Sequence, residues 1–314
     1  GKGRIPVISH ETGNFVTWPL LDATIDRFKD NLKPYWLSPI RDRMAKDGLL
    51  HENEQWTNCS IQLYLFCWKN TIEALRKTAK MSGYEWWLLQ DYWMGSNGIA
   101  DTYYVPKVSP ADLEVVKQLN GAVIVLAAEP GDDLPIDARA PRFLRAYVSG
   151  DVLETSLHVQ NFGTHNIDDG SMVWRVTATS PGAQPKVVCT ETAKASGLQQ
   201  GPGTWQVTAV KCKLPDLGSF ASNPQLPMTV QLEAELKGAD GASVARNQWR
   251  SRVYPIYEDT NLPPGMKVYT ERGLCNSMGK AGLQCGIPDI SEKIPDKSFF
   301  IVTNIDNAAA PARR

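Results

Sequence analysis

The opening stretch of the chain is a short apolar run that is followed by one carboxylate. Apolar positions in residues 4–8 lead into the pair His10-Glu11, and a Gly-Asn turn and a Trp-Pro pair follow. This pattern predicts a short buried strand whose carboxyl end carries Glu11. In parallel barrels and doubly wound sheets, catalytic groups lie at the carboxyl ends of the strands. The same pattern is also typical of a strand that ends in a solvated glutamate, so spacing alone leaves both interpretations open.

After this strand, apolar residues recur with the spacing of a helix. The periodicity predicts helices over residues 20–29, 38–47 and 60–80, with residues 53–58 as a polar connection. The last helix is the longest and the most clearly amphipathic. Glu73 is suitably spaced to pair with Lys69, which we interpret as a surface ion pair on a solvated face.

A second strand is predicted over residues 84–93, rich in aromatic side chains and ending in Gln90 and Asp91. A Gly-rich loop follows, then a helix from a Ser109 cap to about residue 120, then a short strand at 122–127. This order predicts an α/β domain with parallel strands. Because two strands neither close a barrel nor cover a sheet, we expect the rest of this domain upstream of residue 1.

The pattern changes after a Pro- and Gly-containing linker at residues 129–135. About seven short alternating strands separated by Gly-containing turns predict an immunoglobulin-like β-sandwich. The clearest of these strands lie at residues 152–159, 171–177, 203–210, 228–236 and 247–254. From residue 256, strands near 262–269 and 299–303 indicate the start of a further α/β unit. The expected domains are therefore 1–130, 136–255 and 256–314.

Composition excludes some partners. The formal net charge of −1 gives no case for binding nucleic acid or an acidic membrane surface. No apolar run approaches the roughly 18 residues that a membrane span needs. The chain opens without Met and without a signal peptide, which is typical of a processed chain or of the middle of a longer protein. No cluster of residues has metal-ligand spacing, and His158 and His165 stand alone as strand or surface histidines.

The six cysteines fall into three near pairs: Cys59/Cys67, Cys189/Cys212 and Cys275/Cys285. An even count in local pairs favours disulfides, and so an extracellular or secretory location. If one helix carried both Cys59 and Cys67, about 12 Å would separate them, which is too far for a bridge. The triplet that starts at Asn58 fits an N-glycosylation sequon and adds slightly to the secretory interpretation.

Residues 7–19, Val-Ile-Ser-His-Glu-Thr-Gly-Asn-Phe-Val-Thr-Trp-Pro, resemble the seventh-strand motif of glycoside hydrolase family 2, the β-galactosidase and β-glucuronidase group. Residues 83–93 with 98–101 look like its eighth strand and loop, and residues 69–76 look like the helix between them. The resemblance implies the last two strands of a (β/α)8 barrel followed by an immunoglobulin-like sandwich. It is specific over the first 110 residues and architectural from there to about residue 255.

The resemblance implies that Glu11 is the nucleophile of a retaining β-glycosidase that needs no cofactor. Such an enzyme needs a second carboxyl group roughly 5–5.5 Å away as acid/base. In the family this is a Glu on the fourth strand, which the chain lacks, so we expect it in upstream polypeptide. Glu85, near the start of its predicted strand, and Asp91, on the strand that the family uses for substrate contacts, are poor substitutes.

The other candidate site residues each carry two interpretations. His10 and Asn14 flank Glu11 and either orient it and contact the sugar or serve as scaffold. Trp86, Trp87 and Trp93 either stack on a sugar ring or pack in the core. Strand alternation places Trp86 and Trp87 on opposite sides, so at most one faces a barrel mouth.

A rival hypothesis is a non-catalytic relative, acting as a structural or carbohydrate-binding part of a larger assembly, since fold does not fix function. Nothing in the sequence points to one sugar, one linkage or one oligomeric state.

Overall fold

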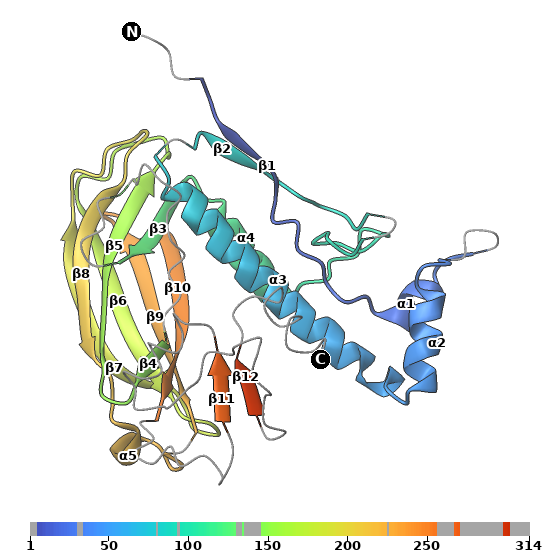
Figure 1. The fold of residues 1–314 in the computed structure, drawn as a ribbon. Helices are drawn as coiled ribbons and strands as arrows, with labels where there is room; N and C mark the ends of the chain where they lie inside the picture. The colour runs from blue at the N-terminus through green and yellow to red at the C-terminus, as the bar shows by residue number, and fades with distance from the viewer. Residues whose placement is uncertain are drawn as a thin grey trace, which may run out of the picture. The chain divides into compact units, whose positions relative to one another are not determined.

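The computed structural model describes residues 5–29, 34–79, 81–92, 95–129, 134, 146–224, 226–255, 267–270 and 298–301. The chain forms two compact units, residues 1–255 and 256–314. Within the first unit, a small α/β part lies beside a β-sandwich (Figure 1). Helices α3 and α4 form the side of the α/β part that faces the sandwich.

The α/β part contains the predicted parallel pair of strands, β1 (Ile8–Thr12) and β2 (Gly83–Trp86). Four helical segments connect them: α1 (Leu21–Ile25), α2 (Ser38–Lys46), the 3-10 turn η1 (Leu50–Glu52) and α3 (Asn53–Arg76). Helix α4 (Pro110–Leu119) follows β2, and the Ser109 hydroxyl caps it as predicted. Strand β2 is shorter than the strand predicted over 84–93.

Helix α3 begins earlier than predicted, so residues 53–58 are helical and not a connection. The reason lies in two polar side chains. Asn53 Oδ1 accepts a hydrogen bond of 2.9 Å from the Leu21 N–H, and its Nδ2 donates to the Pro19 carbonyl. Thr57 donates to the Asn53 carbonyl. Because these bonds satisfy Asn53 and Thr57, both are buried on one face of the helix, while the residues between them stay exposed.

Helix α3 packs beneath the strand pair. Trp68 is fully buried, and its ring lies 4.2 Å from that of Trp86, centroid to centroid. The Trp86 indole N–H donates to the Tyr64 hydroxyl at 3.2 Å. One face of β2 is therefore core.

The β-sandwich consists of a five-stranded sheet ordered β4-β10-β9-β6-β7 and a three-stranded sheet ordered β3-β5-β8. Its strands are β3 (Val123–Ala128), β4 (Ala146–Val148), β5 (Val152–Asn161), β6 (Gly170–Thr179), β7 (Lys186–Ala195), β8 (Trp205–Lys213), β9 (Met228–Lys237) and β10 (Ser243–Tyr254). A four-residue helix, α5 (Leu217–Phe220), follows β8. Burial alternates strictly along β9, as the period of two predicts. Strands β4 and β7 do not coincide with any of the clearest strands predicted from the sequence.

Strand β3 serves both parts of this unit. Ile124 and Leu126 belong to the helical core, whereas Val125 and Ala127 belong to the sandwich core. Strand β3 pairs antiparallel with β5, although it precedes the expected domain boundary at residue 130. Burial on both faces explains why the strand is a continuous apolar run.

The face of α3 that carries Lys69 and Glu73 was predicted to be solvated, and this prediction is wrong. The side chain of Glu73 is 2% exposed and that of Lys69 is 15% exposed. Strand β10 covers them. The Trp249 indole N–H donates to Glu73 Oε2 at 2.9 Å, and Asn247 Nδ2 donates to Glu73 Oε1 at 2.8 Å. Helical spacing cannot show which distant strand packs on a helix face.

Of the three predicted cysteine pairs, Cys189–Cys212 is a disulfide, with a Cα–Cα distance of 6.0 Å. It joins β7 to β8, strands of different sheets. The pairing of Cys59 with Cys67 is wrong: both thiols are free, since one continuous helix carries them. Cys275 and Cys285 lie outside the described residues.

In the second unit, β11 (Lys267–Thr270) pairs parallel with β12 (Ser298–Ile301). Both fall near the two strands predicted there. Over the part of the chain that is described, no helix is long and apolar enough to cross a membrane.

Candidate functional site

Glu11 lies at the carboxyl end of β1 in an unusual backbone conformation. Its φ is +50°, and the register between β1 and β2 shifts between Ser9 and Thr12. A positive φ is uncommon for a residue with a Cβ and costs of order 1 kcal/mol or more. The Glu11 side chain is 46% exposed. The carboxylate at this strand end is therefore accessible to solvent.

The residues after Glu11 hold the kink in place. Thr12 and Gly13 are buried, and Gly13 has a φ of +82°. A Cβ at Gly13 would lie 2.4 Å from Cδ1 of Trp68. The chain therefore needs glycine here both for its conformation and for the contact with α3.

His10 lies between two carboxylates. Its Nε2 is 3.2 Å from Glu85 Oε2, and its Nδ1 is 4.0 Å from Glu11 Oε1. Because β2 ends at Trp86, Glu85 is the next-to-last residue of its strand and lies close to the strand end. The strand predicted over 84–93 is shorter than expected, so Glu85, predicted near the start of its strand, is also close to its end. The imidazole is within hydrogen-bond distance of Glu85, whereas 4.0 Å from Glu11 is an ion-pair distance and too long for a hydrogen bond.

Asn14 is hydrogen-bonded to the loop that follows β2. Asn97, which is buried, donates from Nδ2 to Asn14 Oδ1 at 2.5 Å. Just beyond, the Thr17 N–H and hydroxyl both donate to the Ser96 carbonyl at 2.8 Å. These bonds join the loop after β1 to the loop after β2.

The tryptophans point in different directions. Trp86 packs on α3 and is not brought to Glu11. Trp87, half-buried, follows β2, and its N–H donates to the Thr12 carbonyl at 2.9 Å; the peptide bond to Leu88 is cis. Trp93 lies outside the described residues.

Asp91 is buried in an ion pair. Its Oδ1 lies 2.6 Å from Lys107 Nζ, and the two side chains are 11% and 13% exposed. The Gly98 N–H and the Ser96 hydroxyl also donate to its carboxylate. Burial raises the pKa of Asp91 and lowers the pKa of Lys107. Both oxygens of Asp91 are thus engaged in holding the loop after β2.

Lys107 was not recognised from the sequence. Its ammonium donates to Asp91 and, at 2.9 Å, to the Thr17 hydroxyl. Sixteen and ninety residues separate it from these partners. Such spacings carry no periodic signal, so only the fold reveals the cluster.

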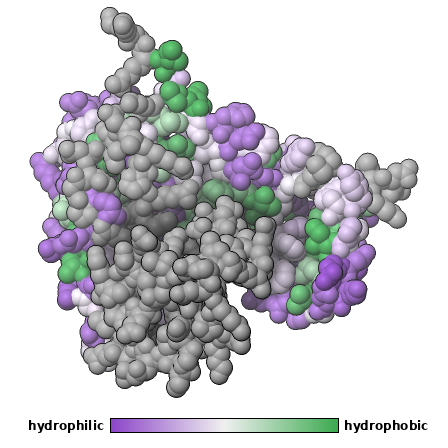
Figure 2. Space-filling model, in the orientation of Figure 1, coloured by the Kyte–Doolittle hydropathy of each residue, from purple (hydrophilic) through white to green (hydrophobic). Residues whose placement is uncertain are grey.

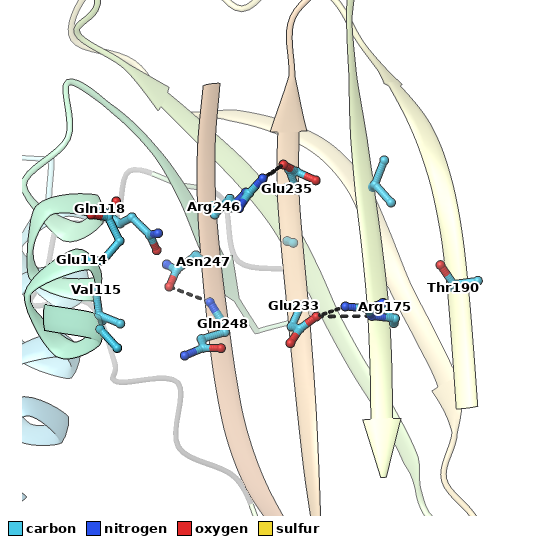
Figure 3. A pocket seen from close by; sticks show the side chains of 13 residues that line it. Glu114, Val115, Gln118, Arg175, Thr190, Glu233, Glu235, Arg246, Asn247 and Gln248 are labelled. Atoms are coloured by element: carbon cyan, nitrogen blue, oxygen red, sulfur yellow. Dashed lines mark hydrogen bonds and ion pairs between the residues drawn. The ribbon is translucent and has the colours of Figure 1, made fainter. Parts of the chain in front are cut away.

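Two cavities in the first unit differ in position and in chemistry. One, of about 710 Å³, lies beyond the carboxyl ends of β1 and β2 and includes Asp91 and Lys107 in its lining. The other, of about 540 Å³, lies between α4 and the outer face of the five-stranded sheet (Figure 3). There Arg175 pairs with Glu233 at 2.5 Å and Arg246 with Glu235 at 2.6 Å. Those charges satisfy one another across strands, as on many exposed sheet faces.

The strand pair also leaves apolar side chains in solvent. Ile5 is 87% exposed, and Val7 and Ile8 are exposed as well. Figure 2 shows this apolar group where the chain enters β1. Parallel strands are rarely left uncovered. Among the described residues, no group of three His, Cys, Asp or Glu side chains could hold a metal ion.

The fold was compared with known proteins. The chain is similar to the exo-chitosanase CsxA of Amycolatopsis orientalis, with a TM-score of 0.39 and 14% identity, over 68% of this chain and 21% of that one. It is similar to β-glucuronidase 2 of Bacteroides uniformis, with a TM-score of 0.24 and 12% identity, over 40% and 12%. It is similar to the sporulation control protein Spo0M of Bacillus subtilis, with a TM-score of 0.29 and 15% identity, over 43% and 50%.

The chain spans about a fifth of the length of the exo-chitosanase, 21%. All three TM-scores lie below 0.5, so a function for this chain has to be inferred from its own residues and not from these likenesses. No family model matches the sequence, and no curated protein matches it.

Proposed function

We propose that this chain is part of a retaining β-glycoside hydrolase similar to glycoside hydrolase family 2, with Glu11 as its nucleophile. The observation that carries the proposal is the backbone of Glu11. A non-glycine residue with a φ of +50° ends a parallel strand and presents a half-exposed carboxylate. Strained conformations of this kind cluster at active sites. The motif around Glu11 adds the family resemblance.

In the proposed reaction, Glu11 attacks the anomeric carbon while a carboxylic acid gives its proton to the leaving oxygen. The glycosidic bond between the anomeric carbon and the leaving oxygen breaks, and a covalent glycosyl-enzyme forms. The same acid, now a carboxylate, takes a proton from water, which attacks the anomeric carbon and releases Glu11 with overall retention. In this proposal His10 orients Glu11, and Glu85 orients His10. The distances of 4.0 Å between His10 and Glu11 and 3.2 Å between His10 and Glu85 support these roles.

The acid/base is proposed to come from upstream polypeptide that completes a (β/α)8 barrel. Strands β1 and β2 would be the last two strands of that barrel, and the exposed apolar residues at β1 would pack against a preceding strand. The sandwich would be the immunoglobulin-like domain that follows the barrel. The disulfide Cys189–Cys212 supports an extracellular or secretory location, and Asn58 stays a predicted glycosylation site.

The test is Glu11→Gln in the full-length protein, assayed on aryl β-glycosides. Loss of the nucleophile should lower kcat by about 10³-fold or more. Glu85→Gln is the matched control, because it removes a neighbouring carboxylate and leaves the nucleophile in place. It should lower kcat much less. Undiminished turnover by the Glu11 variant would remove this residue from the mechanism.

One observation favours a second candidate, a non-catalytic carbohydrate-binding or structural part of a larger assembly. At β1 the side chains of Ile5, Val7 and Ile8 are exposed, as on a surface that packs against other polypeptide. Upstream sequence discriminates between the two: a fourth strand ending in Asn-Glu supports the enzyme, and its absence supports the non-catalytic relative.

A further inference from the structure

The larger cavity is built by the two loops that follow β1 and β2. One wall consists of residues 16–20, and a second of residues 91, 92, 95, 96, 101, 102 and 105–107. Side chains from α1, α2 and the first turns of α3 close the others. Its volume of about 710 Å³ is in the range of small-molecule sites. Its lining begins at Val16, in the loop that follows the strand of the proposed nucleophile, and Glu11 itself is not part of the lining.

Apolar side chains that are open to solvent gather in this lining. Five of the exposed large apolar residues of the chain line this one cavity: Val16, Leu20, Ile40, Tyr92 and Val105. The rings of Trp18, Phe28 and Trp36 also line it. Scattered exposed apolar residues need no explanation, but several around one concave space indicate a binding surface.

The charged residues of the lining cancel one another. Lys107 pairs with Asp91 at 2.6 Å, and Arg27 pairs with Asp101 at 2.6 Å. Two cations therefore face two anions, each in a direct contact. A charged ligand would lose its hydration and find each of these opposite charges already paired. An uncharged ligand with apolar faces meets no such penalty.

We infer that this cavity binds an uncharged, ring-bearing group with apolar faces. This inference rests on the proposed function in one respect: there the group would be the leaving-group end of the glycoside that Glu11 attacks. The shared chemistry is a flat or puckered ring, which either an aryl alcohol or a neutral sugar would supply. The neighbouring Thr24 side chain offers a hydrogen bond to a hydroxyl group of the ligand.

The experiment measures binding to the complete chain by ligand-observed NMR. Benzyl alcohol, benzoate and benzylammonium share one ring and differ in charge, and methyl β-glucoside tests the sugar source. We expect benzyl alcohol or methyl β-glucoside to bind. If benzyl alcohol binds, benzoate and benzylammonium should bind at least about tenfold more weakly than benzyl alcohol. Ala23→Trp, on the exposed lining face of α1, should fill the cavity and weaken binding by about tenfold or more.

Ala45→Trp is the matched control, since Ala45 is an exposed alanine of α2 outside the lining. This variant should bind the neutral ligand with an affinity within about twofold of the wild-type affinity. Ile40→Trp repeats the test from a second element in case Ala23→Trp does not fold. Equal binding of charged and uncharged rings, no binding of either neutral ligand, or binding unchanged by both lining variants would overturn the inference. The proposed nucleophile is tested separately, by the turnover of Glu11→Gln. Failure of the cavity is loss of ligand binding and failure of the nucleophile is undiminished turnover, so the two give different results.

Discussion

The buried carboxylate of Glu73 joins helix α3 to the sandwich, and its replacement gives the sharpest test of the packing. Glu73 accepts hydrogen bonds from Trp249 at 2.9 Å and from Asn247 at 2.8 Å, and it forms an ion pair with Lys69. Lys69 Nζ also donates to Asn247 Oδ1 and lies 5.2 Å from the centre of the Trp249 ring. Every polar atom of the carboxylate is thus used inside the protein.

Glu73→Gln keeps the shape of the side chain and removes the charge. The amide offers one acceptor oxygen, so one of the two donors, Trp249 or Asn247, faces an NH2 group and is left unsatisfied. That alone costs about 1–3 kcal/mol. Lys69 also loses its counter-charge, and breaking a buried pair costs about 3–5 kcal/mol in total. Because Lys69 is 15% exposed and can regain some water, we expect about 3 kcal/mol.

The assay is urea unfolding followed by far-UV circular dichroism, with the transition of the first unit analysed alone. Lys69→Met and the double variant Lys69→Met/Glu73→Gln complete a thermodynamic cycle. The double variant should cost less than the sum of the single variants, by about 1–3 kcal/mol, because it leaves no isolated charge. Glu54→Gln, an exposed position of the same helix, should cost less than about 1 kcal/mol. A loss below about 1 kcal/mol for Glu73→Gln, or simple additivity, would refute the reasoning.

Three further changes test separate contacts. Gly13→Ala should lower the free energy of unfolding in urea by about 2–4 kcal/mol, because the new Cβ meets Trp68. Gly48→Ala is the control, since Gly48 has a similar φ of +71° and open space around it, and it should lower this free energy by only about 1 kcal/mol. Equal losses in the two variants would contradict the contact with Trp68. Reduction of the disulfide, whose cysteines are 23 residues apart, should destabilise the sandwich by about 3 kcal/mol in the same assay; an unchanged midpoint would show that the bridge adds nothing. The Arg175 guanidinium holds the pKa of Glu233 below its ordinary value of 4.5, so this pair stabilises the fold above pH 4.5 and is lost as the pH falls through the folded-state pKa. Urea midpoints of the wild type and Glu233→Gln should therefore converge in acid, and a gap that widens there would be evidence against the pair.

Local patterns predicted what local chemistry determines. The alternation in β9 and the Ser109 cap of α4 are satisfied within a few residues, and both appear where the sequence indicated. Helix α3 was recognised, but its first turns were not, because Asn53 is satisfied by Leu21, more than thirty residues away. Polar composition indicates a connection only when no distant partner lets a polar residue such as Asn53 be buried in a helix.

The candidate site shows the same division. The strand end at Glu11 was predicted from its neighbours in sequence, whereas its positive φ and its link through His10 to Glu85 depend on how β1 and β2 align. The Asp91–Lys107 pair is likewise a product of two loops folding together. The roles assigned to Glu11, His10 and Asp91 stay predictions until activity is measured.

A continuous path of contacts links the proposed nucleophile to the sandwich. Glu11 is followed by Gly13, which fits against Trp68 of α3. Glu73, five residues further along the same helix, is bonded to Trp249 of β10. A helix is stiff over such a distance, so a shift of α3 on the sandwich would move the indole on which the kink after Glu11 rests. If Glu11 is catalytic, Glu73→Gln should therefore lower kcat as well as stability, with KM less affected. A variant that is destabilised but fully active at 25 °C would show that the sandwich only stabilises α3 and does not position the strand end.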